Sequence, residues 1–490
     1  MIKIEAKEER YLYNAYHMVK AFCTSEEVEQ CCDKELEADL KLTEADGTEH
    51  VFTADTSNCS AGDIRRELDR EVYRYLADRT GTELAWGMLT GVRPAKLATK
   101  AVEQGVEKTE FIKQFREEYL VSAGKAELAY DIAVRERDVL SELDYKDGYS
   151  LYVGIPFCPS VCSYCSFSSG PIDKWRDQIP AYLDALCKEL AYIGKVSSEK
   201  KLNTIYIGGG TPTSLDAEQL DQILTCIDQS FSREHLLEYT VEAGRPDSIT
   251  EEKLQVIKRH GVTRISINPQ TMQQKTLDRI GRKHSVQEVK DIYRMARKLG
   301  FDNINMDLIA GLPGEGLEDM KDTLAQIQEL APDSLTVHSL AIKRAAQMGQ
   351  EKSTLGYVRD LEEQTDHPER MAETLSAMIE CAHETAYEME LVPYYLYRQK
   401  NIAGNFENVG YAKVDKAGIY NILIMEEKQS IIAAGAGAST KIVLPVPVPV
   451  PGSRNGKTTT LIRVENVKSI RDYIARIDEM IERKGEWLWH

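Results

Sequence analysis

The middle of the chain alternates short apolar runs with longer segments whose apolar residues recur every three or four positions. The short runs predict strands at residues 151–155, 204–207, 238–242, 264–268, 303–309 and 334–339. The longer segments predict helices at residues 180–193, 217–230, 250–260, 285–299 and 317–330. Repeated strand–helix units require a parallel sheet with right-handed crossovers. These six units predict an α/β fold, a partial (β/α)6 barrel of the TIM-like kind.

The regions on either side of this alternation have a different pattern. We predict an N-terminal α+β accessory domain at residues 1–148, a barrel core at residues 149–345 and a C-terminal α+β cap at residues 346–490. The accessory domain should contain strands at 40–43 and 51–54 around a turn, followed by a helix that begins near Gly62.

The predicted cap combines helices, strands and a proline-rich run. Helices are expected at residues 368–390 and 467–484, and paired strands at residues 418–426 and 430–435. Residues 444–452 alternate proline with valine. Because proline has no N–H to donate to a β-ladder, this run predicts an extended, polyproline-like surface loop.

Composition restricts the class of protein. The 490 residues carry a net charge of -18, which argues against nonspecific binding to nucleic acid or to an anionic membrane. The sequence lacks the run of about 18 apolar residues that predicts a transmembrane helix, and its charged N-terminus lacks the apolar core of a signal peptide. Ten cysteines without a secretion signal are typical of a reducing compartment, so we expect a cytoplasmic protein.

Three cysteines follow the first predicted barrel strand at the spacing C-x3-C-x2-C. They are Cys158, Cys162 and Cys165. Three thiolates this close can ligate three irons of one [4Fe-4S] cluster, which leaves the fourth iron open to a small chelating molecule such as an amino acid head group. Structural zinc and three unconnected thiols are the alternatives. Zinc sites usually use four ligands in two pairs, and the sequence has no second C-x2-C pair, so we favour the cluster.

Further candidate residues lie at the ends of the next predicted strands, where barrel folds place their sites. Residues 208–213 (Gly-Gly-Gly-Thr-Pro-Thr) follow the second strand, and glycines there let the backbone approach a ligand closely. Glu242 ends the third strand, and Asp307 lies inside the apolar fifth strand. A buried acid needs a partner, which is either a ligand amine or hydroxyl, or a neighbouring Lys or Arg in an ion pair.

These features together resemble a known family. The segments that carry the resemblance are residues 151–158, 208–213, 264–270 and 307–314. They are similar to the radical SAM signature and, more closely, to the oxygen-independent coproporphyrinogen III oxidase family and its HemZ-type branch. The resemblance spans residues 152–438, more than half of the chain. It implies a [4Fe-4S] cluster, S-adenosyl-L-methionine (SAM) and oxidative decarboxylation of coproporphyrinogen III to protoporphyrinogen IX in heme biosynthesis.

The resemblance also implies roles for individual residues. The three cysteines of the triad would ligate the cluster. Positions that contact one or other of two SAM molecules in the family match Tyr152, Tyr164, Gly209, Gly210, Thr211, Glu242, Gln270, Arg282, Asp307 and Ala341. Among them, Gln270, Arg282 and Asp307 would belong to the second SAM. No residue is assigned as catalytic.

Two departures from the family pattern leave other interpretations open. The decarboxylase carries a further cysteine after the triad, where this chain has Ser-Phe-Ser-Ser at residues 166–169. The heme-chaperone branch carries an H-N-x-x-Y-W motif, and residues 407–412 here have Glu in place of its His and Ala in place of its Trp. The alternatives are a heme-binding chaperone and a radical SAM enzyme that modifies or degrades heme. For His284 and His338, surface or ion-pair roles are favoured over heme ligation.

The resemblance also implies partners. A tetrapyrrole substrate with several carboxylates needs basic side chains around it, and the candidates by position are Arg245, Lys343, Arg344 and Arg398. A low-potential electron donor, such as flavodoxin or ferredoxin, would reduce the cluster. Arg93, in the N-terminal region, is expected to form a structural ion pair.

Overall fold

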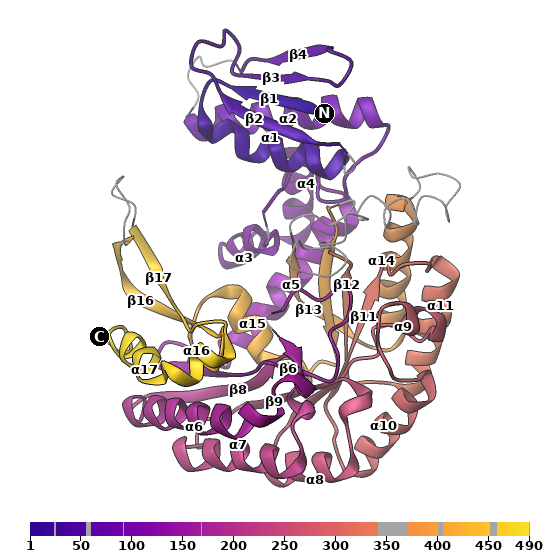
Figure 1. Cartoon of the computed structure of the whole chain (residues 1–490). Coiled ribbons are helices and arrows are strands. Elements are labelled where there is room, and N and C mark those ends of the chain that lie inside the picture. Colours follow the sequence, from indigo (N-terminus) through magenta and orange to yellow (C-terminus); the bar gives the residue numbers. More distant parts are fainter. Residues whose placement is uncertain are drawn as a thin grey trace.

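The computed structural model describes residues 1–23, 26–54, 60–91, 93–167, 169–341, 371–399, 405–450 and 458–489 (Figure 1). No helix within these ranges is long and apolar enough to cross a membrane. The predicted substrate ligands Lys343 and Arg344, and the predicted boundary between residues 345 and 346, lie outside the described residues.

One large sheet forms the centre of the molecule. Its strands, in hydrogen-bonded order, are β13 (Val392–Arg398), β14 (Glu407–Ala412), β12 (Ser334–Ser339), β11 (Ile304–Ala310), β10 (Arg264–Ile267), β9 (Glu238–Gly244), β8 (Lys201–Gly209), β5 (Gly148–Ile155), β15 (Ser430–Ala434), β16 (Ser439–Pro449) and β17 (Thr458–Glu465). From β12 to β15 every neighbouring pair is parallel. This parallel stretch contains all six predicted barrel strands. The described strand order has two ends, so the sheet curves without closing into a ring (Figure 1).

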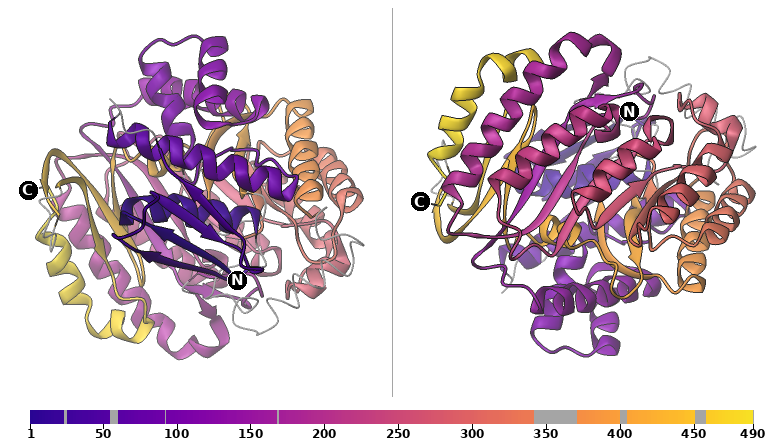
Figure 2. Two further views of the ribbon diagram at one scale, coloured as in Figure 1. Left: turned by 90° about the horizontal axis from the view of Figure 1, so that it is seen from above. Right: turned by 90° about the horizontal axis from the view of Figure 1, so that it is seen from below.

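Helices between the parallel strands cover the outer face of this sheet, as the view from below in Figure 2 shows. They are α6 (Ile179–Val196), α7 (Ala217–Ser230), α8 (Glu251–Arg259), α10 (Val286–Lys298) and α11 (Leu317–Leu330), all expected from their periodicity. The short α9 (Gln274–Arg279) was not predicted. Leu186, Leu224 and Ile257 of these helices are buried in the main apolar core. Because helices cover the outer face of the sheet, polar side chains that could bind a ligand are expected on its inner face.

The N-terminal part of the chain has a smaller sheet and its own apolar core (Figure 1). The strands β1 (Ile2–Ala6), β2 (Val28–Cys32), β3 (Leu40–Thr43) and β4 (Glu49–Phe52) form the order β2-β1-β3-β4, and α1 (Glu9–Phe22) and α2 (Ala61–Thr80) supply further core residues. The pair β3 and β4 and the helix α2 agree with the prediction, whereas β1, α1 and β2 were not predicted.

Three helices lead from this part to the large sheet. They are α3 (Ala95–Glu103), α4 (Lys108–Tyr119) and α5 (Ala123–Ser141). Their buried residues, such as Ala98, Phe111 and Ile132, belong to the apolar core of the main body. The domain division at residue 148 stays a prediction.

Arg93 joins the N-terminal part to α15 (Ile419–Glu426). Its Nη2 lies 2.8 Å from Glu427 Oε2, and its Nη1 donates to the carbonyl of Met425. The predicted structural ion pair is therefore confirmed, and it holds the C-terminal end of α15.

The helix α15 corrects the prediction of a strand at residues 418–426. A short apolar run does not by itself distinguish a strand from a buried helix. Here the buried carboxylate of Glu238 accepts hydrogen bonds from the backbone N–H groups of Ile419, at 2.6 Å, and Tyr420, at 3.3 Å. A helix start needs acceptors for its first N–H groups. Glu238 supplies them from β9, which is distant in the sequence.

The proline-rich run corrects a second prediction. Pro445, Pro447 and Pro449 lie within β16, which pairs with β17 and has an irregular register between Val443 and Val448. β15 pairs with β16 only at Ile431 and Lys441. The proline run therefore has one neighbouring strand in the described structure, so its missing N–H groups interrupt no central ladder.

The remaining C-terminal elements agree in part. α14 (Met371–Glu388) matches the predicted helix at 368–390. β15 is a strand as predicted, but it pairs with β5 and β16 and not with residues 418–426. The predicted terminal helix is two helices, α16 (Ile470–Ala475) and α17 (Ile477–Gly485), which meet at Arg476.

Candidate active site

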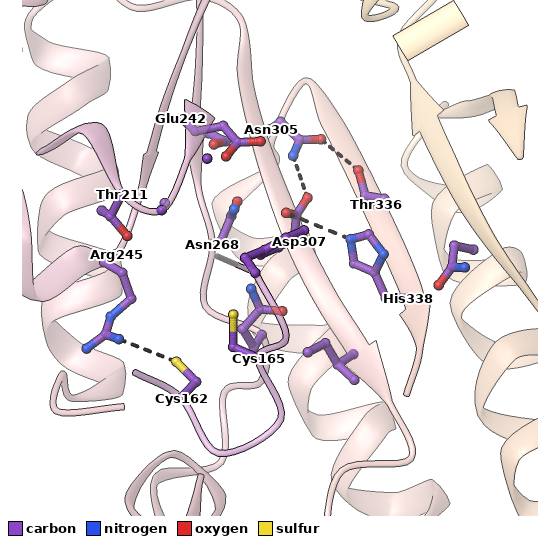
Figure 3. Close-up of a pocket in the computed structure, with 18 of the residues that line it drawn as sticks. Cys162, Cys165, Thr211, Glu242, Arg245, Asn268, Asn305, Asp307, Thr336 and His338 are labelled. Carbon is purple, nitrogen blue, oxygen red and sulfur yellow. Dashed lines mark hydrogen bonds and ion pairs between the residues drawn. The ribbon is translucent and has the colours of Figure 1, made fainter. Parts of the chain in front are cut away.

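A cavity of about 520 Å³ lies on the inner face of the large sheet. Successive residues of a strand point to opposite faces, so the cavity is lined by alternate residues of the parallel strands. Asn305 and Asp307 of β11 and Thr336 and His338 of β12 face the cavity (Figure 3). Ile309 of β11 also lines it. The cysteine loop and α15 supply further parts of its lining.

The three predicted cluster ligands all line this cavity. β5 continues through β6 (Phe157–Cys158) into the loop that carries Cys162 and Cys165, and the chain returns at β7 (Gly170–Pro171). The N–H of Cys165 donates to the carbonyl of Cys162 at 3.0 Å, which makes a tight turn. Burial raises the pKa of the Cys165 thiol to about 11, so this thiol must lose its proton before it can ligate a metal.

Arg245 contacts the cysteine loop, although its position had suggested a substrate ligand (Figure 3). Its Nη1 donates to Cys162 Sγ at 3.4 Å and to the carbonyl of Ser160 at 3.1 Å. Asp247 accepts from Nε at 2.8 Å and from Nη2 at 2.6 Å. These bonds occupy the guanidinium group. Arg245 therefore has no N–H left for a substrate carboxylate and lies beside Cys162, a predicted cluster ligand.

Arg282 holds the same loop through Tyr164. Its Nη1 donates to the Tyr164 hydroxyl at 3.1 Å, and its Nη2 donates to the carbonyls of Asn268, at 2.7 Å, and Gly244, at 3.2 Å. Arg282 is only 3% exposed. Both residues, predicted as SAM contacts, line the cavity, and they link the loop to the ends of β9 and β10.

The glycine-rich turn after β8 packs directly against the start of the cysteine loop. The N–H of Gly210 donates to the carbonyl of Ile155, and the N–H of Thr211 donates to the carbonyl of Phe157, both at 2.7 Å. A Cβ on Gly210 would lie 2.5 Å from the Phe157 carbonyl oxygen, and Gly209 has φ +106°. Glycine is therefore needed here for two backbones to approach. Thr211 Oγ1 donates to Cys158 Sγ at 3.5 Å, so the turn also touches the triad.

Glu242 points into the cavity from β9, and its partner is Tyr206 on the neighbouring strand. The Tyr206 hydroxyl donates to Glu242 Oε1, and no Lys or Arg within the described ranges forms an ion pair with this carboxylate. Burial raises the pKa of Glu242 to about 7, although the bond from Tyr206 opposes the shift. A carboxylate of this kind is suited to a cationic or hydroxyl-bearing ligand, because a positive charge would restore its ionised form.

Asp307 is held by two cavity neighbours (Figure 3). Asn305 Nδ2 donates to it at 2.7 Å, and His338 Nε2 lies 3.8 Å from its Oδ2. Burial raises the pKa of Asp307, but nearby His338 and the bond from Asn305 outweigh burial and leave this pKa below its usual value. His338 therefore lies where it pairs with Asp307 when its ring is protonated, and the Tyr397 hydroxyl lies 3.4 Å from its other ring nitrogen, Nδ1.

Three buried polar atoms beside these acids have no hydrogen-bond partner in the described part of the chain. They are Ser266 Oγ, Asn268 Oδ1 and Gln270 Oε1, and all three residues line the cavity. We call this set the polar wall. A buried unpartnered polar atom costs about 1–3 kcal/mol. The polar wall therefore fits a ligand that brings hydrogen-bond donors.

Gln270, predicted as a SAM contact, has an unusual backbone within this wall. Its φ is 70°, in the left-handed region that non-glycine residues rarely adopt. Its N–H donates to the Asp307 carbonyl and its carbonyl accepts from the Ile309 N–H, each at 2.9 Å. The strained backbone is thus fixed by β11, which directs the side chain to the cavity.

Tyrosines form another part of the cavity lining. The rings of Tyr206 and Tyr420 stack with centroids 4.4 Å apart, and Tyr152 stacks on Tyr206 at 6.2 Å. Tyr152 was a predicted SAM contact, whereas Tyr420 comes from α15 and was not. Ala341, the last predicted SAM contact, lines the same cavity. Every predicted cofactor residue therefore lies on one cavity.

Several residues that line the cavity were not predicted, namely Tyr206, Thr240, Ser266, Asn268, Asn305, Thr336 and Tyr420. For two of them the sequence contains a pattern that could have identified them. Thr240 precedes Glu242 by two residues, and Asn305 precedes Asp307 by two. Polar residues at period two in an apolar strand share one face. Tyr420 had no such signal, because its place depends on how α15 packs.

Other candidates lie away from the cavity or are bound elsewhere. Arg398 donates to the carbonyl of Leu89 at 2.7 Å and is only 3% exposed, which removes it as a substrate ligand. Glu407 accepts from Trp86 Nε1 at 2.7 Å and pairs with Lys125 at 2.5 Å. Burial and nearby Arg282 lower the pKa of His284 to about 4, so it is a buried neutral histidine and not a surface one.

The donor set of three cysteines fits an iron–sulfur cluster. Within the described ranges, no three Cys, His, Asp or Glu side chains are grouped to hold one metal ion. Cluster thiolates each bind a different iron, so they need to surround a common space without meeting at a point. The triad borders such a space, and the polar wall and Glu242 offer contacts for a second group beside it.

The chain is similar to known proteins. The model of the radical SAM superfamily matches residues 152–327. The "oxygen-independent coproporphyrinogen-III oxidase-like protein HemZ" of Bacillus subtilis (strain 168) is 42% identical over 378 residues, which are 76% of this chain and 73% of that protein. The heme chaperone HemW of the same organism is 37% identical over 200 residues, which are 40% of this chain and 51% of that protein.

The fold also resembles a solved structure. Coproporphyrinogen III oxidase (HemN) from Escherichia coli, described as a radical SAM enzyme, has a TM-score of 0.52 with 19% identity. The match covers 70% of this chain and 73% of that one. At this identity the likeness concerns the fold alone.

Proposed function

This chain belongs to the HemZ-like oxygen-independent coproporphyrinogen-III oxidase family of the radical SAM superfamily, and from that membership we propose that it decarboxylates coproporphyrinogen III. The observation that carries the proposal is the meeting of the cysteine triad, Glu242 and the polar wall on one cavity. In the proposed reaction, a propionate side chain loses one hydrogen atom to the radical derived from SAM, one electron to an external one-electron acceptor, and carbon dioxide, and becomes a vinyl group. Two rounds give protoporphyrinogen IX.

Different residues would bind the two cofactors. Cys158, Cys162 and Cys165 would hold a [4Fe-4S] cluster, and Glu242 would accept a hydrogen bond from the amine or ribose of SAM. When bound, the reduced cluster and SAM supply the radical that abstracts hydrogen. Cavities of roughly 300–1,000 Å³ are typical for small ligands and cofactors, and this one lies within that range.

The chain's own residues would shape the environment of the reaction. Tyr152, Tyr206 and Tyr420 place aromatic rings along the cavity and reduce the room for water there. Excluding water protects a reactive intermediate from side reactions. Arg282 and Tyr164 keep the cysteine loop in place against β9 and β10.

The heme-carrier alternative is weakened by Glu407. This residue stands where the heme-chaperone branch has histidine, and its carboxylate is buried between Trp86 and Lys125. A buried carboxylate with two partners offers no heme ligand. The match to the related HemW protein covers only 40% of this chain. We therefore favour an enzyme over a heme carrier. We further propose that it works in the cytoplasm and is reduced by a low-potential donor such as flavodoxin or ferredoxin.

An anaerobic product assay tests the proposal. The reconstituted protein is incubated with SAM, a low-potential reductant and either coproporphyrinogen III or heme, and tetrapyrroles are analysed by chromatography and mass spectrometry. We expect loss of carbon dioxide from coproporphyrinogen III and no turnover in air. The matched control is the variant with all three triad cysteines changed to Ala.

Two outcomes would replace the proposal. Consumption of heme with formation of 5'-deoxyadenosine, while coproporphyrinogen is untouched, would show a heme-modifying enzyme. If SAM is cleaved with neither tetrapyrrole, the protein is better described as a binder.

A further inference from the structure

Every N–H of the buried Arg245 guanidinium has a partner. Three of them are directed at the cysteine loop: Nη1 donates to Cys162 Sγ at 3.4 Å and to the Ser160 carbonyl at 3.1 Å, and Nη2 donates to Ser160 Oγ at 3.1 Å. The other two are taken by Asp247, at 2.8 and 2.6 Å. With 4% exposure, the guanidinium is a fixed cation within the protein.

The local sequence explains why this cation stays in place. Gly244 ends β9 with φ +55°, and the N–H of Arg245 donates to the Ala243 carbonyl at 2.6 Å, which turns the chain sharply. Pro246 then begins a short 3-10 helix that contains Asp247. Burial raises the pKa of Asp247, but the bonds from Arg245 outweigh burial and lower it, so the carboxylate stays ionised. The planar fork of arginine suits this two-point contact.

We propose that Arg245 is a positioning residue that raises the reduction potential of the cluster through its hydrogen bond to Cys162 Sγ. The inference rests on the cluster of the proposed function. An electron added to a cluster increases its negative charge, so a nearby cation and an N–H···S bond stabilise the reduced form. Hydrogen bonds to sulfur, net charge and solvent exposure are the usual determinants of cluster potential.

The charges around Arg245 support this direction of effect. Asp247 offsets part of the positive charge through its two bonds with Arg245, whereas Arg245 itself donates to Cys162 Sγ. Arg282 contributes a second cation through Tyr164, and the low pKa of His284 keeps that residue neutral above about pH 4. The summed charge of Arg245, Asp247, Arg282 and His284 beside the cysteine loop is therefore positive.

The test measures the midpoint potential of the reconstituted cluster by redox titration with electron paramagnetic resonance, without tetrapyrrole. Arg245→Gln removes the cation and should lower the potential. We expect the ratio of reduced to oxidised cluster at a fixed solution potential to fall by about tenfold, which corresponds to ~59 mV for a one-electron couple. Arg245→Lys keeps the charge and should recover part of the shift.

Two further variants separate tuning from a structural effect. Asp247→Asn removes the offsetting negative charge and should shift the potential upward, opposite to Arg245→Gln. Arg176→Gln is the matched control, because Arg176 is 71% exposed and pairs with Asp173 outside the cavity lining. It should leave the potential unchanged.

The possible results are distinct. An unchanged potential in Arg245→Gln with full iron content overturns the inference. If that variant loses iron, Asp247→Asn decides, and a potential equal to or below that of the unaltered protein overturns it. Absence of a cluster in the unaltered protein would instead overturn the proposed function. A normal potential series without porphyrin turnover would leave the Arg245 inference standing.

Discussion

The cysteine loop and the polar wall face the same cavity, but their polar groups are bonded very differently. Arg245 beside Cys162 has a partner for every N–H, and Arg282 fixes Tyr164 to two carbonyls. On the polar wall, Ser266, Asn268 and Gln270 each present a buried oxygen without a partner in the described structure.

This difference indicates separate tasks. Bonds between the chain's own groups keep the loop in one shape, which suits thiolates that must surround a cluster. Unpartnered acceptors are unfavourable until a ligand supplies donors. We interpret the loop as a scaffold and the polar wall, with Glu242, as the surface that recognises SAM.

The largest expected effect comes from removing the triad. The anaerobically reconstituted protein should hold about four irons per chain, and Cys158→Ala should hold less than one. The fold should survive, because the cysteines lie in a loop held by other bonds. Iron analysis and circular dichroism measure the two properties. A triple Cys→Ala variant with normal iron content would contradict the assignment.

Glu242→Gln tests the recognition surface. It should weaken SAM binding by about 1–3 kcal/mol, typical of a lost charge-assisted contact, and leave the iron content unchanged. Calorimetry of SAM binding measures the change. Unaltered binding would make Glu242 a structural partner of Tyr206 and nothing more.

The pH dependence of SAM binding follows from the raised pKa of Glu242, about 7. Its folded pKa lies above the usual value near 4.5, so the ionised form destabilises the free protein increasingly as pH rises between these values. A cationic ligand favours that ionised form, so SAM affinity should increase from pH 6 to pH 8 by several-fold. The Glu242→Gln variant should lose this trend, and a persistent trend would assign it to another group.

A matched pair of serine variants gives the smallest effect. Ser266→Ala removes an unpartnered hydroxyl, so unfolding stability without ligand should stay the same or rise, while SAM binding weakens by about 0.5–1.5 kcal/mol. Ser150→Ala removes a buried hydroxyl that bonds Gln429 and Thr204, so it should lower stability by about 1 kcal/mol and leave SAM binding unchanged. Denaturant unfolding and calorimetry would measure both. Equal behaviour of the two variants would refute the distinction between an unpartnered hydroxyl of the polar wall and a hydroxyl that is bonded within the protein.

The sequence alone indicated much of the central fold. Apolar runs identified the six predicted barrel strands among the parallel strands, because a strand buried on both faces has few other compositions open to it. It failed at residues 418–426, where a buried apolar run suits either a strand or a helix. The Glu238 carboxylate favours the helix because it accepts hydrogen bonds from the first N–H groups of α15. No local sequence pattern reveals an acceptor that is supplied by β9.

The candidate site divides in the same way. The spacing of Cys158, Cys162 and Cys165 determined the kind of cofactor to expect, since ligands close in sequence stay close in any fold. Only the tertiary structure decided that Arg245 donates a hydrogen bond to Cys162, that Tyr420 stacks on Tyr206 and that Glu407 is buried against Trp86. Each of these contacts joins elements far apart in the chain, and side-chain partners at such separations depend on how the elements pack.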